Sequence, residues 1–217
     1  MRCIPSIACL SAALLLSTSG TAAAQAGSHV ETRLGLELVS SGIEPVAADS
    51  AGIGSRAWGV QVTGNLIAFR VLSLNAEGGI IGMSDEQPFT QETNQGEKTS
   101  GVAAGMGTLS AGLRTPPLSL GGEKPFHLSA GVNAGRSWVD VNRDITYCYN
   151  CHAEDVQVQA GSFVEPVLQV GAGRGALIAR YRMYSGDSDF KDALMLGYTI
   201  STRRPAPKPA EAAEAPR

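Results

Sequence analysis

Residues 30–38 read Val-Glu-Thr-Arg-Leu-Gly-Leu-Glu-Leu, and this stretch decides the fold. Apolar side chains recur at every second position, through Leu34, Leu36 and Leu38, and charged or small residues fill the positions between them. A period of two puts successive side chains on opposite faces of a β-strand, whereas an amphipathic helix needs a period near 3.6. The stretch therefore predicts a strand with one apolar and one polar face.

Seven further segments show strand-like patterns, six of them with the same clear alternation. They lie at residues 58–63, 72–80, 101–113, 126–134, 157–169, 177–183 and 193–200. The segment at 101–113 is rich in small residues, so polarity does not assign its faces, and no segment has a convincing helical period. Long polar connections mostly alternate with short ones, as they do in an up-and-down barrel whose two ends face different compartments. We therefore predict an all-β chain of eight antiparallel strands.

Length and composition limit the other possibilities. The chain has 217 residues, 17% of them charged, and a formal net charge of −3, which excludes a highly charged disordered chain and gives no basic surface for nucleic acid. Residues 1–26 combine a positive start, an apolar core and small residues, the pattern of a secretory signal peptide cleaved after Ala24 or Ala26. The predicted barrel occupies 29–201, and the Pro/Ala-rich segment 202–217 is expected to be a disordered tail.

Eight alternating strands fit a membrane barrel with its apolar face outward, or a soluble barrel or sandwich with its apolar face inward, the soluble barrel binding an apolar ligand inside. The polar face is too sparse in charge for a solvent-exposed surface, so we predict that it lines a filled interior, where opposite charges neutralise one another. The predicted lumen network is Glu31, Arg33, Glu37, Glu77, His127, Glu165, Arg180 and Arg182.

Aromatic residues cluster near the predicted strand ends, as they do in the two girdles of a membrane barrel. The predicted girdle residues are Trp58, Phe69, Phe126, Trp138, Tyr181, Tyr184, Phe190 and Tyr198. The predicted fold class is an eight-stranded antiparallel up-and-down transmembrane β-barrel with a filled polar interior.

Residues 29–201 resemble the small eight-stranded bacterial outer-membrane barrels of the OmpA/OmpX-like type. The resemblance is carried by the signal peptide, the alternating runs and the closing strand Leu194-Met195-Leu196-Gly197-Tyr198-Thr199-Ile200. The resemblance implies export to the outer membrane, contact with its lipid and lipopolysaccharide, and recognition of the last strand by the outer-membrane assembly machinery. It further implies a monomeric, non-enzymatic, non-porin protein with a structural or surface-interaction role. The expected contact surface is formed by loops around 83–98 and 140–155. The chain departs from many such proteins by continuing past the closing strand.

Two local patterns suggest chemistry. The first is Cys148-Tyr149-Asn150-Cys151-His152, which matches the c-type haem attachment pattern. Because the segment lies in a predicted loop, we favour a disulfide between Cys148 and Cys151. Metal binding and a redox role are the alternatives, and we expect no cofactor. His127, Ser129 and Asp140 offer the residue types of an acyl-transfer triad, and lipid A deacylases with a similar His-x-Ser-Asn pattern are outer-membrane barrels. Ala130 replaces the asparagine here, so a lumen histidine is the preferred interpretation and a lipid A enzyme the alternative.

The two predicted ends also differ in charge. The long connections are acidic and include Asp187 and Asp189, which could bind Ca²⁺ but lack the loop pattern of a calcium site. Arg70, Arg114 and Arg174 gather at the opposite end, together with two arginines that follow the last strand.

Overall fold

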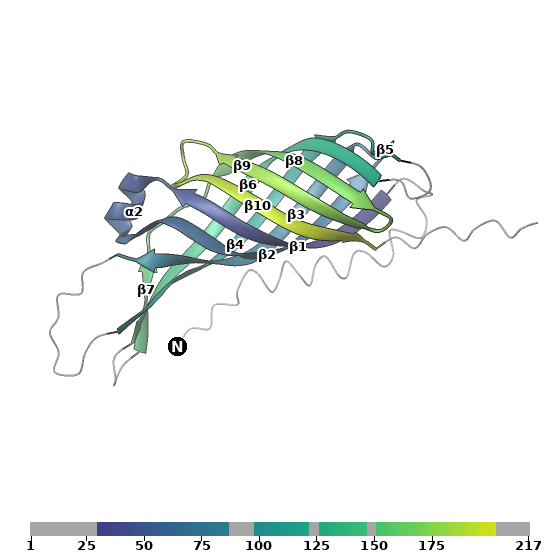
Figure 1. Ribbon diagram of the computed structural model, residues 1–217. Coiled ribbons are helices and arrows are strands. Elements are labelled where there is room, and N and C mark those ends of the chain that lie inside the picture. The colour runs from purple at the N-terminus through teal and green to yellow at the C-terminus, as the bar shows by residue number, and fades with distance from the viewer. Residues whose placement is uncertain (1–29, 87–97, 122–125, 147–150, 203–217) are drawn as a thin grey trace, which may run out of the picture.

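The computed structural model describes residues 30–86, 98–121, 126–146 and 151–202 (Figure 1). The predicted signal peptide, most of the predicted tail and Cys148 lie outside these residues. Within them no helix is long and apolar enough to cross a bilayer.

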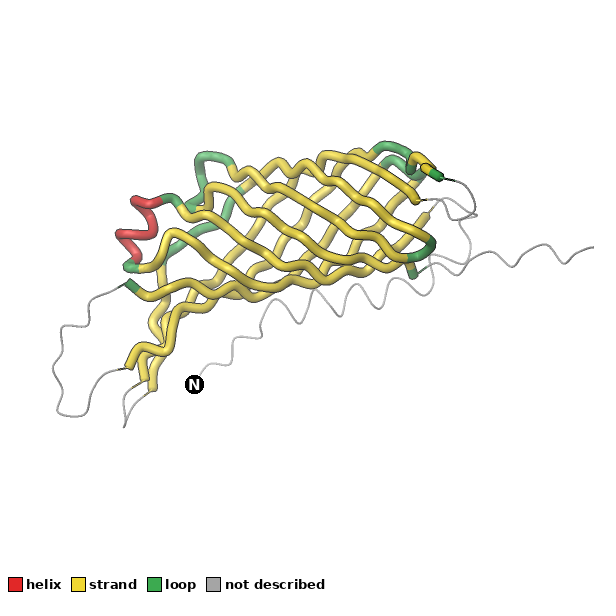
Figure 2. The backbone as a smooth tube through the Cα atoms, viewed as in Figure 1, coloured by secondary structure: helices red, strands yellow, loops and turns green. Residues whose placement is uncertain are grey.

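Eight long strands form a closed antiparallel barrel, in which each strand pairs with its neighbours along the chain and the last strand pairs with the first (Figures 1 and 2). The barrel strands are β1 (Val30–Ile43), β2 (Ile53–Ala68), β3 (Leu72–Asp85), β4 (Lys98–Arg114), β6 (Phe126–Thr146), β8 (Ser162–Ala172), β9 (Gly175–Tyr184) and β10 (Phe190–Ser201). Two short strands, β5 (Leu118–Leu120) and β7 (Cys151–Val156), pair with β6. The predicted fold class is confirmed.

The two ends of the barrel differ. At one end, which we call the turn end, lie the first residue of β1, the last of β10, and the short connections β2–β3 and β8–β9. The other end, the loop end, carries the helix α2 (Pro45–Ala51), the β6–β7 hairpin and the loop between β9 and β10, and α2 stands there beyond the strands (Figure 2).

Three details at the loop end differ from the prediction. The predicted loop around 140–155 is largely the β6–β7 hairpin, because β6 continues to Thr146. The strand predicted from 157 begins only at Ser162, because Val158 leaves the ladder and is buried. The helix α2 was not expected. Its seven residues are too few for a visible helical period, although Pro45 at its start and Gly52, which ends it at φ 63°, are favoured at helix termini.

The apolar face of the strands is the outer face. Among the described residues, thirty large hydrophobic side chains are exposed, almost all of them on the barrel wall. Leu36, Val62 and Tyr198 illustrate how they adjoin across neighbouring strands. A soluble monomer rarely exposes a contiguous apolar surface of this extent. The orientation is opposite to that required by a soluble barrel with an apolar ligand inside.

Candidate functional site

The middle of the barrel is filled by a cluster of five charged side chains from four strands, which we call the central cluster. Its members are Glu37 on β1, Glu77 on β3, Glu165 on β8, and Arg180 and Arg182 on β9, each at most 4% exposed. The two arginines point inward together because residues two apart on a strand share a face.

Arg180 joins all three carboxylates. Its Nε donates a hydrogen bond to Glu37 at 3.0 Å, and its Nη1 donates to Glu165 at 3.0 Å. It also donates to Glu77 through Nη1 and to Glu37 through Nη2. One guanidinium therefore ties strands β1, β3 and β8 to β9.

Arg182 forms the second layer of the cluster. It lies 2.7 Å from both Glu77 and Glu165 through Nη2, and its Nε donates to Glu165 at 2.9 Å. Its Nη1 donates to the hydroxyls of Thr108 and Ser137, at 3.2 and 3.3 Å. Arg182 thus has partners for all three of its nitrogen atoms, which is what a buried guanidinium requires.

The central cluster carries three carboxylates and two guanidiniums, a formal charge of −1. Neutral amides supply further donors: Gln61 Nε2 bonds Glu37 at 3.0 Å, and Asn133 Nδ2 bonds Glu165 at 3.2 Å. The sequence interpretation missed these amides and the two hydroxyls that Arg182 contacts. The sequence did indicate that Gln61 points inward, because it stands between the outward residues Val60 and Val62.

Three of the predicted lumen residues lie apart from the central cluster. Arg33 pairs with Glu31 at 2.7 Å near the turn end, where the side chains are 21% and 30% exposed. His127 is half-buried at the mouth of the barrel, and its Nδ1 lies 3.2 Å from the hydroxyl of Ser119. His127 lines the barrel interior and has a hydrogen-bond partner, as predicted, but it is half-buried and not buried because this position on β6 is level with the barrel opening.

A cavity of about 380 Å³ opens at the turn end, and we call it the turn-end pocket. Arg33, Arg70, Arg114 and His127 are among its lining residues. Arg114 Nη2 donates hydrogen bonds of 2.6 Å to Ser129 Oγ and of 2.6 Å to Gln169 Oε1 in the pocket wall.

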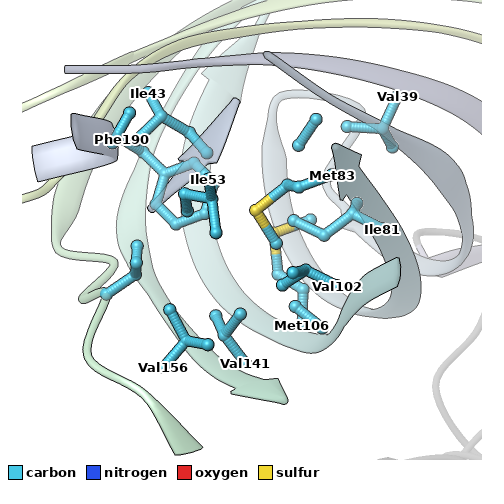
Figure 3. Close-up of a cluster of buried hydrophobic side chains, with 14 of the residues drawn as sticks. Val39, Ile43, Ile53, Ile81, Met83, Val102, Met106, Val141, Val156 and Phe190 are labelled. Atoms are coloured by element: carbon cyan, nitrogen blue, oxygen red, sulfur yellow. The ribbon is translucent and has the colours of Figure 1, made fainter. Parts of the chain in front are cut away.

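The interior of the loop end is apolar (Figure 3). Side chains from β1, β2, β3, β4, β6 and β10 gather there, including Val39, Ile53, Ile81 and Phe190, and Ala48 of α2 packs on them. Arg143 Nη2 donates to the carbonyls of the last helical residue and the one after it, at 2.9 and 3.1 Å. These bonds satisfy carbonyls that a helix end leaves open and hold α2 on the barrel.

The girdle assignment is wrong for Phe190 and Tyr184. Phe190 is 1% exposed and belongs to the apolar interior. Tyr184 is half-buried, with its ring 5.7 Å from that of Phe190 and 5.9 Å from that of Phe163. At this level the strands extend past the outer apolar surface, and the side chains that point into the barrel are apolar.

The other six girdle residues are exposed on the outside, between 42% and 66%. Trp58, Trp138 and Tyr181 lie toward the loop end, and Phe69, Phe126 and Tyr198 toward the turn end. Phe126 and Trp138 stand on one strand, 12 positions apart. At about 3.3 Å per residue and a tilt of about 40°, they are about 30 Å apart along the barrel axis, close to the thickness of a bilayer core.

The structure does not bring the acyl-transfer residues together. Ser129 faces inward and accepts from Arg114, whereas Asp140 is exposed near the loop end of the same strand. His127 lies at the turn end. A triad needs its members in hydrogen-bond contact, so these three do not form one.

The described part of the chain contains no group of three or more His, Cys, Asp or Glu side chains that could hold a metal ion. Asp187 accepts a hydrogen bond from Ser185 Oγ at 2.5 Å, which lowers the pKa of this loop carboxyl, and Asp189 accepts from the Gln159 N–H at 2.7 Å. The side chain of Cys151 lies outside the described residues, as does all of Cys148, so their disulfide stays a prediction.

Comparisons with known proteins give matches among solved structures alone. No protein-family model matches it, and no curated protein does. Among solved structures, Neisserial surface protein A matches at 11% identity over 80% of this chain and 97% of that chain, with a TM-score of 0.44. Ail, the attachment invasion locus protein of Yersinia pestis, solved with the heparin analogue sucrose octasulfate, matches at 11% identity over the same shares, with a TM-score of 0.41. The fold itself is assigned from the strand pairing and side-chain orientation of this chain.

Proposed function

We propose that this protein is an integral outer-membrane barrel without a pore, whose loop end is a surface-interaction site. The observation that carries the proposal is the outer apolar surface, bounded by two aromatic girdles about one bilayer core apart. In the proposed topology the turn end faces the periplasm and the loop end faces outward. The surrounding partners are membrane lipid and lipopolysaccharide, the barrel is a monomer, and the assembly machinery reads its closing strand.

The filled interior supports a non-porin role. The central cluster crosses the barrel from β1 to β8, and the apolar interior of the loop end adds a second layer of buried side chains toward the loop end. Eight-stranded barrels have interiors only wide enough to be filled by side chains. We expect no stable conductance when the purified protein is added to a planar lipid bilayer.

The loop end offers an acidic surface. Its exposed carboxylates in the described ranges are Glu44, Asp49, Glu86, Asp140, Asp155 and Asp187, and its exposed cations are Arg56, Arg136 and Lys191. Binding residues are commonly carried on loops held by a rigid scaffold. The excess of carboxylates favours a partner with a basic surface and predicts binding that weakens with salt.

Fluorescence quenching tests the membrane assignment. Trp58 and Trp138 are the two tryptophans of the chain, and both are exposed on the outer face. In reconstituted vesicles, brominated lipids should quench both, and Trp58→Phe and Trp138→Phe variants separate their signals. Full emission in brominated vesicles, or release of the folded protein with periplasmic contents in the absence of detergent, would contradict the proposal.

A non-enzymatic role is part of the proposal and has its own test. A mass spectrum of lipid A from cells with and without the protein should be the same. A change in the acyl chains of lipid A would support the enzyme alternative instead.

A further inference from the structure

We propose that the turn-end pocket binds a small ligand through a carboxylate or phosphate group, with Arg114 as the main anchor. The inference goes beyond the proposed function, because the pocket lies at the opposite end of the barrel from the proposed interaction surface.

The pocket has the size of a small-molecule site. Its volume of about 380 Å³ falls within the range of about 300–1,000 Å³ that is usual for ligand pockets. It is open at the turn end, and on the other side the central cluster closes the barrel. A ligand therefore enters from one side only.

The residues that line the pocket carry a net positive charge, which favours an anionic ligand. Arg33, Arg70 and Arg114 contribute three positive charges and Glu31 one negative charge, which leaves +2 with the histidine neutral. The one carboxylate is already paired with Arg33 at 2.7 Å. The other two arginines are left to attract a ligand, and the partly enclosed cavity strengthens this attraction relative to an open surface.

Arg114 is held in place for such a role. Its two hydrogen bonds, each of 2.6 Å, go to the neutral oxygen atoms of Ser129 and Gln169, so they orient the guanidinium without cancelling its charge. The group is half-buried, and Arg33 and Glu31 are close enough to interact with it electrostatically. A positioned, planar guanidinium can bind a carboxylate or phosphate in a two-pronged manner.

A tight turn brings a second arginine to the rim. Phe69 and Arg70 adopt positive φ angles of 53° and 63°, and the Val71 N–H donates to the Ala68 carbonyl at 3.2 Å. Positive φ at both central residues is characteristic of the two-residue hairpin turn that matches strand twist. This turn fixes the backbone of Arg70 beside the opening, where its side chain lines the pocket.

Two sources could supply the anionic group. One is a soluble molecule that bears a carboxylate or phosphate. The other is the chain itself, since the sequence after Thr202 contains Glu211 and Glu214. The chemistry recognised by Arg114 is the same in both cases, and the experiment separates them.

Calorimetric titration of the full mature chain in maltoside micelles tests the site, with inorganic pyrophosphate and citrate as probes. A maltoside carries no phosphate that would compete. We expect saturable binding that Arg114→Gln weakens at least about tenfold, since a hydrogen bond to a charged group contributes about 1.5–3 kcal/mol. Arg174→Gln is the matched control, because Arg174 lies at the same end but donates to the carbonyl of Ser201 and does not line the pocket.

A double variant, Glu211→Gln with Glu214→Gln, identifies the source. Tighter probe binding by this variant than by the parent chain means that the tail carboxylates occupy the site, and unchanged binding means that the ligand is a soluble molecule. If Arg114→Gln does not fold, Arg70→Gln in the exposed turn replaces it, with an expected loss of about threefold from one weaker, partly screened charge. The proposal is overturned if neither probe binds saturably to the parent or the double variant, or if Arg174→Gln weakens binding as much as the pocket variants do.

Discussion

Replacement of Arg182 by methionine should destabilise the barrel strongly. The side chain is 0% exposed, and it is held by Glu77 at 2.7 Å and by Glu165 at 2.7 and 2.9 Å. Without it, the central cluster would have three carboxylates and one guanidinium, and its formal charge would change from −1 to −2. Removal of one partner from a buried ion pair costs about 3–5 kcal/mol, and we expect the free energy of unfolding of Arg182→Met to fall by this amount.

Reversible urea unfolding in lipid vesicles, followed by tryptophan fluorescence, measures this change. Arg33→Met is the matched control: its single ion pair with Glu31 is partly exposed, so its loss should cost no more than about 1 kcal/mol. Addition of Glu165→Gln to Arg182→Met restores the charge of −1 and should recover about 1–3 kcal/mol of the loss. Equal losses for Arg182→Met and Arg33→Met would refute the assignment of the central cluster as a buried, ion-paired interior.

Three further predictions test other parts of the barrel by the same unfolding assay or by titration. Leu36→Arg places a charge on the outer apolar surface and should cost about 2–4 kcal/mol, whereas Val46→Arg on the exposed side of α2 should change stability by no more than about 0.5 kcal/mol. Phe190→Ala should cost about 3–5 kcal/mol because the ring is fully buried at the loop end, and Leu36→Ala, which lipid can cover, should cost clearly less. Ser185→Ala removes the hydrogen bond that lowers the pKa of Asp187, so an NMR titration should show that pKa rising toward its ordinary value. Because the pKa is depressed in the folded chain, the associated stability is present above the unfolded pKa and declines as pH falls through the folded value.

The membrane-facing part of the barrel was predictable because lipid imposes a simple rule on it. Outward positions between the girdles are mostly apolar or small, and strand geometry alternates the two faces except at the few bulges. The pattern around Leu34, Leu36 and Leu38 therefore predicted the outer face directly. The five charges of the central cluster were also predictable as inward residues, since lipid disfavours charged side chains on the outer face in the middle of a strand.

The partners within the interior were less predictable, because they depend on strand stagger. The register places Glu77 opposite Thr63 on β2 and Thr108 on β4, and a pattern on one strand does not specify it. For the same reason, the sequence did not show that Glu31 and His127 would sit at the mouth rather than in the middle. The helix α2 was missed because its seven residues are too few to show a helical period, and the long β6–β7 hairpin was missed because tertiary contacts decide the structure there.

At the loop end the apolar face of the strands changes from the outside to the inside of the barrel. This change explains why Tyr184 and Phe190 were wrongly assigned to the girdle. On β1, outward Leu38 is 66% exposed and inward Val39 is 2% exposed, and on β3 outward Ile80 is 65% exposed and inward Ile81 is 0% exposed. Toward the loop end from each of these pairs, the outward positions turn polar or small, and the inward positions are largely apolar, with buried Ser41 on β1 and Asp85 on β3 as exceptions. Such a switch is expected where a strand leaves lipid for water, because the apolar side chains must then be covered by the protein itself. Adjacent apolar residues in these strands therefore mark the membrane boundary. Beyond them the loop end has an apolar core of its own, like that of a water-soluble protein. This core can keep the proposed interaction surface rigid without support from lipid.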